Sequence, residues 1–107
     1  MSIIYLIECR RDYDTVYKIG YSKKSASRRL DSLQTGNDGE LKIINTFHSV
    51  HQQQVERTLQ RFFAHEKIKQ GGTEWFRLDL EDVQNFSTMC QKIENNLNAL
   101  SQNEKLL

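Results

Sequence analysis

The 107-residue chain contains no proline and only two cysteines. Two cysteines are too few for the disulfide framework of a small secreted domain, so Cys9 and Cys90, each in an apolar stretch, are predicted to be buried thiols. No apolar run approaches the roughly 20 residues of a membrane span, and Met1–Arg11 lacks the pattern of a signal peptide. These absences argue against a secreted disulfide scaffold or a membrane protein, and they predict a protein of the cytoplasm or of a nucleus.

The chain also has almost no excess of one charge, because it contains 15 basic and 14 acidic residues and its formal net charge is +1. The distribution is uneven: residues 1–36 hold seven basic side chains against four acids, and the remainder holds eight against ten. The first third is therefore expected to present phosphate-binding charge, or else an ordinary solvated surface. The candidate phosphate contacts are Lys18, Lys23, Lys24 and Arg28.

Alternating and continuous apolar patterns predict three main strands. Ser2–Cys9 carries apolar side chains on both faces, which is typical of a central strand. Val16–Tyr21 follows after a short polar turn, so the two are expected to form an antiparallel hairpin. Leu41–Phe47 is predicted to be the third strand, and Thr73–Leu78 a short extended piece after a Gly71-Gly72 turn.

Three further segments show helical spacing. The first covers about residues 24–35, the second is capped by Ser49, and the last is capped by Asp79. The order predicts an α+β fold, a three-stranded, mainly antiparallel sheet flanked by helices in the order β-β-α-β-α-(β)-α. We expect one domain over residues 1–100 and a frayed tail over 101–107.

Four side chains on these elements could act together on a phosphodiester. With Val55 at zero and about 100° per residue, Glu56 lies near 100°, at the rim of the second helix's apolar face. Arg29 lies at the rim of the first helix in the same way, and Tyr5 and Tyr17 lie on neighbouring strands. A carboxylate can hold a divalent cation, a guanidinium can clamp a phosphate, and a phenol can position or deprotonate water.

The segments that carry these side chains resemble the GIY-YIG nuclease superfamily. They are IIYLI at 3–7, YKIG at 17–20, RRL at 28–30 and VERTL at 55–59. The strings SLQTGN at 32–37 and GTEWFRL at 72–78 resemble its compact phage and bacterial branch. That branch takes its name from a coliphage open reading frame and is related to the meiotically up-regulated nuclease-like domain.

The resemblance implies a DNA-binding domain that uses one Mg²⁺ or Mn²⁺ ion. It matches Tyr5 to the first motif tyrosine, Arg29 to the phosphate-binding arginine with Arg28 as a rival, and Glu56 to the metal ligand. Tyr17 or Lys18 occupies the second motif, and alignment on Ile19-Gly20 puts Lys18 in the tyrosine's place.

Three functions stay open at this point. The first is a metal-dependent endonuclease, the second a DNA-binding module without turnover, and the third a protein-interaction domain, for which the last helix could form a homodimer. Glu56 favours the enzyme, because a pure binder gains little from an acid beside phosphate. Leu33 favours the binder, because the superfamily often has a catalytic His or Tyr four residues after its arginine.

Overall fold

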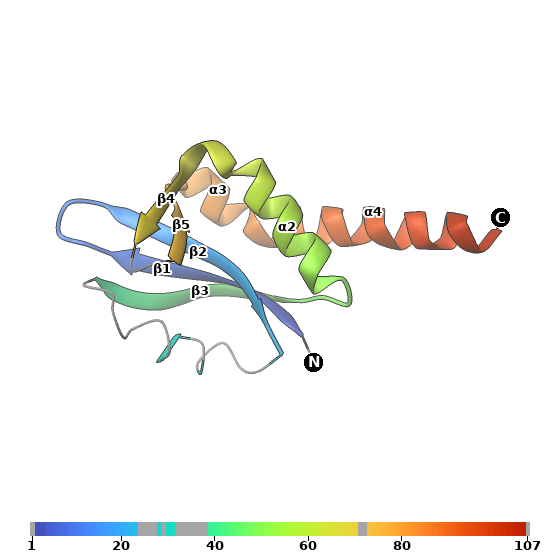
Figure 1. Cartoon of the computed structure of the whole chain (residues 1–107), viewed down its shortest axis with the longest axis horizontal. Helices are drawn as coiled ribbons and strands as arrows, with labels where there is room; N and C mark the ends of the chain where they lie inside the picture. The colour runs from blue at the N-terminus through green and yellow to red at the C-terminus, as the bar shows by residue number, and fades with distance from the viewer. Residues whose placement is uncertain (1, 24–27, 29, 32–38, 71–72, 107) are drawn as a thin grey trace.

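The computed structural model describes residues 2–23, 28, 30–31, 39–70 and 73–106. Its centre is a five-stranded sheet in the order β3-β1-β2-β5-β4 (Figure 1). The strands are β1 (Ile3–Arg10), β2 (Thr15–Ser22), β3 (Glu40–His48), β4 (Lys67–Gln70) and β5 (Thr73–Phe76). Every pairing is antiparallel, so the predicted α+β class is confirmed.

The hairpin of β1 and β2 is confirmed, with Tyr5 opposite Gly20 and Glu8 opposite Tyr17. Its turn is closed by Arg11, whose guanidinium donates to both carboxylate oxygens of Asp14 at 2.6 and 2.5 Å. That hydrogen bond is also the main reason why the pKa of Asp14 lies below its usual value. The turn therefore holds its shape through a charge-assisted contact between residues three apart.

The sheet has five strands where the sequence patterns predicted three. Lys67–Gln70 contains one apolar residue, Ile68, and so shows none of the alternation that marks a half-buried strand. It becomes strand β4 by pairing with β5, which places Ile68 opposite Trp75. Trp75 and Phe76 of β5 are fully buried.

The helices are α2 (Gln52–Phe62), the short 3-10 helix η1 (Ala64–Glu66), α3 (Leu80–Gln84) and α4 (Phe86–Leu106). The predicted Asp79 cap is confirmed, but Asn85 divides the expected last helix into α3 and α4, and α4 continues to Leu106. The predicted Ser49 cap is wrong, because the N-cap of α2 is His51. The Ser49 hydroxyl instead accepts the backbone N–H of His51 and donates to Glu94 at 2.8 Å.

Two apolar cores lie on opposite faces of the sheet. We call the first the Tyr5 face; its buried members are Ile3, Tyr5, Ile7, Cys9, Val16, Leu41 and Trp75. We call the second the α2 face, because α2 and α4 cover it (Figure 1); it includes Ile4, Leu6, Ile19, Val55, Leu59, Phe63, Phe76, Phe86 and Cys90. Both cysteines are free and buried, as predicted.

The predicted helix over 24–35 lies mostly outside the described residues. Residues 28, 30 and 31 are helical, and Leu30 packs against the Tyr5 face. The candidate site residues Lys24 and Arg29 fall outside the description, as does Leu33. Among the described residues, no helix has both the length and the apolar character to cross a bilayer.

Candidate active site

Among the residues that the structure describes, β5 pairs with β2 over only part of its length, which leaves the rest of that side of β2 open. The two strands share one register pair, Tyr17 opposite Phe76. Further along β2, the backbone carbonyl of Ile19 accepts a hydrogen bond of 3.0 Å from Nε2 of Gln60, a side chain of α2. A side-chain amide thus bonds a carbonyl at the sheet edge, and it ties α2 to the open end of β2.

A pocket lies at this open edge. Its walls come from Tyr5 of β1, from residues 18–23 in and after β2, and from Glu56 and Gln60 of α2. Glu56 is half-buried, so its predicted position at the rim of the helix is confirmed. Helix α2 covers the face of the sheet opposite to Tyr5. Tyr5 and Glu56 nevertheless line one pocket, because both side chains reach the edge of β2.

Gly20 allows Tyr5 to reach this pocket. A Cβ atom at residue 20 would collide with the Cζ and hydroxyl oxygen of the Tyr5 ring and would lie 3.0 Å from its Cε1. The ring therefore lies directly against the backbone of β2. This close approach gives a physical reason for glycine at the end of the YKIG motif.

The structure brings Lys18, and not Tyr17, to the pocket. Lys18 is only 9% exposed and lines the pocket, whereas Tyr17 packs against the α2 face. The two differ because successive side chains of a strand point to opposite faces. Burial raises the pKa of Tyr17, and the charge and hydrogen bond of the Glu8 carboxylate raise it further, so this phenol is a poor proton acceptor at neutral pH.

Two pocket residues, Tyr21 and Gln60, were not predicted from the sequence. The hydroxyl of Tyr21 accepts a hydrogen bond of 3.2 Å from Nε2 of Gln53. Gln53, Glu56 and Gln60 are three and four residues apart, which places them on one stripe of α2. That spacing was a signal for Gln60, whereas Tyr21 could be placed only once the edge of β2 was known.

The charges in the pocket suit a phosphate group. Lys18 and Lys23 bring two ammonium groups, and Glu56 brings the only carboxylate among the pocket residues that the structure describes. Arg28, the rival for the phosphate-binding role, is exposed. Positive side chains around a half-buried edge raise the local concentration of anions.

The donor set also fits a weakly held divalent cation. Nowhere in the described part of the chain do three His, Cys, Asp or Glu side chains gather into a metal-binding group. Mg²⁺, however, is commonly bound through one or two carboxylates, with water and substrate phosphate completing its shell. Glu56, the one carboxylate among the described pocket residues, matches the lower end of that range.

The family that matches this chain is GIY-YIG-like and of phage type. The chain belongs to the T5orf172 domain family, which matches residues 2–101. The family resemblance read from the motifs is confirmed at this level. A search of the curated proteins and a search of the solved structures each found no match.

Proposed function

We propose that the chain binds DNA at the open edge of β2 and cleaves a phosphodiester bond there with the help of one divalent cation. The observation that supports this most strongly is that Tyr5, Lys18 and Glu56, which are distant in sequence, line one pocket. The nuclease-like character of the family supports the same proposal.

Each side chain has a separate role in this proposal. Lys18 and Lys23 hold the phosphate through their side-chain amines, which line the pocket. The phenol of Tyr5 or Tyr21 positions the attacking water, and Arg29 keeps the phosphate-binding role that the resemblance implies. Glu56 would hold Mg²⁺ or Mn²⁺, which would supply positive charge to the reacting phosphate.

A DNA-binding module without turnover is the second candidate. The observation in its favour is that Lys18 stands in the pocket where the family pattern has a tyrosine, while Tyr17 lies on the other face. A protonated lysine binds phosphate well but is a poor general base at neutral pH. The two candidates share the DNA site and differ only in whether a bond is broken.

A plasmid-nicking assay with Mg²⁺ or Mn²⁺ separates the candidates. The wild type is expected to nick, Glu56→Gln to bind DNA without nicking, and Glu81→Gln, an exposed acid on α3, to behave as the wild type. Lys18→Ala should bind DNA more weakly, whereas Tyr17→Phe should bind as the wild type does. A wild type that binds but never nicks supports the module without turnover, and nicking by Glu56→Gln would overturn the proposed site.

The homodimer predicted through the last helix stays a prediction. Helix α4 extends beyond the sheet (Figure 1). Leu100 on this helix is 59% exposed. Sedimentation equilibrium over a range of concentrations tests the dimer, with Leu100→Ser as the variant that should weaken it. A wild type that stays monomeric throughout would rule out the dimer and leave the DNA site unaffected.

A further inference from the structure

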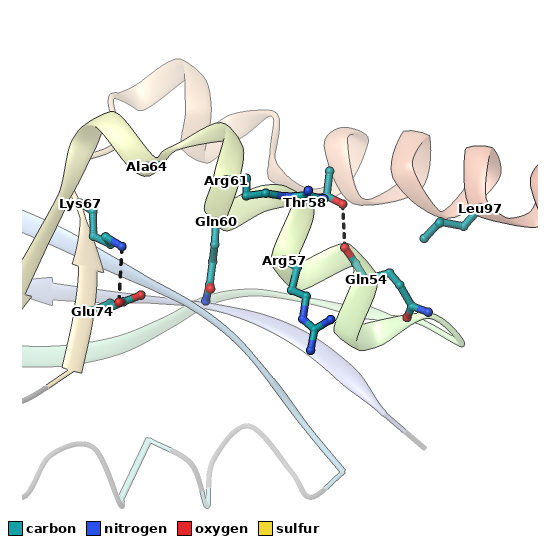
Figure 2. A pocket seen from close by; sticks show the side chains of 9 residues that line it. All are labelled: Gln54, Arg57, Thr58, Gln60, Arg61, Ala64, Lys67, Glu74 and Leu97. Carbon is teal, nitrogen blue, oxygen red and sulfur yellow. Dashed lines mark hydrogen bonds and ion pairs between the residues drawn. The ribbon is translucent and has the colours of Figure 1, made fainter.

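A second pocket lies against the outer side of α2, next to the candidate active site. It has a volume of about 520 Å³ and is bordered by α2, by the β4–β5 hairpin and by Leu97 of α4 (Figure 2). Three cationic side chains line it: Arg57 and Arg61 of α2, and Lys67 of β4. Glu74 of β5 is the one acid among its lining residues.

The two arginines are available to an external anion. Both are exposed, and neither forms an ion pair with any residue that the structure describes. Lys67 is partly neutralised, because its Nζ lies 3.5 Å from Oε1 of Glu74. Like charges four residues apart destabilise a helix, so this pair carries a cost that binding an anion would offset.

The spacing of the arginines suits an extended chain of phosphates better than a single ion. Residues 57 and 61 are one turn apart, which separates them by about 6 Å along the axis of α2 and by about 40° around it. They form a short row on α2, and Lys67 on the neighbouring hairpin lines the same pocket. A nucleic-acid strand presents negative charges at comparable intervals, and phosphate contacts of this kind position it without reading its sequence.

The row of cations is continuous with the pocket at the edge of β2. Gln60 lines both pockets, and on the helical wheel it lies between Glu56 and Arg57. Figure 2 shows Arg57 and Gln60 leaving α2 on the same side. A strand seated on the arginines would therefore pass Gln60 and arrive beside Glu56.

We propose that Arg57, Arg61 and Lys67 form a track for the phosphate backbone of DNA, leading along α2 to the site at the edge of β2. This inference rests on the proposed function, since it extends the same DNA across a second surface. The track supplies affinity and direction, whereas Glu56 and its neighbours act on the phosphate that reaches the pocket.

The test compares the double variant Arg57→Gln, Arg61→Gln with a matched control, Lys42→Gln, Lys92→Gln, which removes two exposed cations from β3 and α4. Binding of a labelled DNA duplex is measured by fluorescence anisotropy in EDTA over a series of salt concentrations. The double variant is expected to bind about tenfold more weakly. The slope of the logarithm of its affinity against the logarithm of salt concentration should be smaller by about two, because two phosphate contacts are lost. The control is expected to match the wild type.

The outcomes separate the track from the proposed function. Wild-type affinity and salt dependence in the double variant would overturn the track, as would an equal loss in the control. A wild type that does not bind DNA would overturn both proposals. A wild type that binds DNA but never nicks it would contradict only the cleavage step, and the expected loss of affinity in the double variant would still support the track. Polyglutamate that competes as strongly as unlabelled DNA would show that the pocket accepts an acidic polypeptide, and this result would also overturn the track.

Discussion

At the scale of single residues, the closest packing in the candidate site is that of Tyr5 against Gly20. Gly20→Ala places a methyl group inside the volume of the Tyr5 ring, so we expect it to lower the free energy of unfolding by about 1–3 kcal/mol. Denaturant unfolding followed by circular dichroism measures this cost. In a Tyr5→Leu background the same change should cost much less, and equal costs in both backgrounds would contradict the proposed contact.

Cys90 offers a second residue-scale prediction, which concerns pH. Burial, followed by the nearby Glu94 carboxylate, raises the pKa of the Cys90 thiol to about 12 from its usual 9.0. In a Cys9→Ala variant, Cys90 should therefore resist alkylation at neutral pH until the protein unfolds. Because the unfolded thiol ionises first, the folded state should lose stability as the pH rises above 9.0, and Cys90→Ala should reduce that loss. Rapid alkylation of the folded protein would show that the thiol is accessible.

At the scale of elements, Glu94 joins α4 to the start of α2. Glu94 is 7% exposed, and its carboxylate accepts from the Ser49 hydroxyl at 2.8 Å and from the backbone N–H groups of Val50 and His51 at 3.3 Å. Glu94→Ala leaves the Ser49 hydroxyl and the backbone N–H of Val50 without this acceptor, while the N–H of His51 keeps the Ser49 oxygen, so the change should cost about 2–3 kcal/mol of unfolding free energy.

The matched control for Glu94 is Asn96→Ala, an exposed change on the same helix, which is expected to cost less than about 0.5 kcal/mol. Both variants are compared by urea unfolding. Similar costs for the two would mean that the buried carboxylate contributes little and that apolar packing alone holds α4 against α2.

At the scale of the whole molecule, β1 connects the two cores, because Ile4 and Leu6 belong to the α2 face while Tyr5 and Ile7 belong to the Tyr5 face. The two faces should therefore unfold in one transition. Leu59→Ala on the α2 face is expected to cost about 2–5 kcal/mol. The variant should shift the unfolding midpoint by the same amount whether unfolding is followed by the fluorescence of Trp75, on the opposite face, or by far-ultraviolet circular dichroism. A fluorescence transition that stays in place would show two independent cores.

Some features of this protein followed from the sequence by itself. The hairpin of β1 and β2, the buried central strand and the half-buried position of Glu56 were predicted correctly, because each depends on the spacing of neighbouring residues. The Asp79 cap was local in the same sense, since the side chain accepts a hydrogen bond from the backbone N–H of Asp82, three residues away. Period and spacing carry this information without any knowledge of the fold.

Only the tertiary structure decided the rest. Strand β4 exists because β5 lies beside it, and its sequence has too little alternation to indicate a strand. The choice between Tyr17 and Lys18 depended on the register of the hairpin, because a slip of one residue exchanges the two faces. Tyr5 and Glu56 come from opposite sides of the sheet. They line one pocket because β2 is left open where its pairing with β5 ends. Such a meeting depends on contacts between distant segments, which local patterns do not specify.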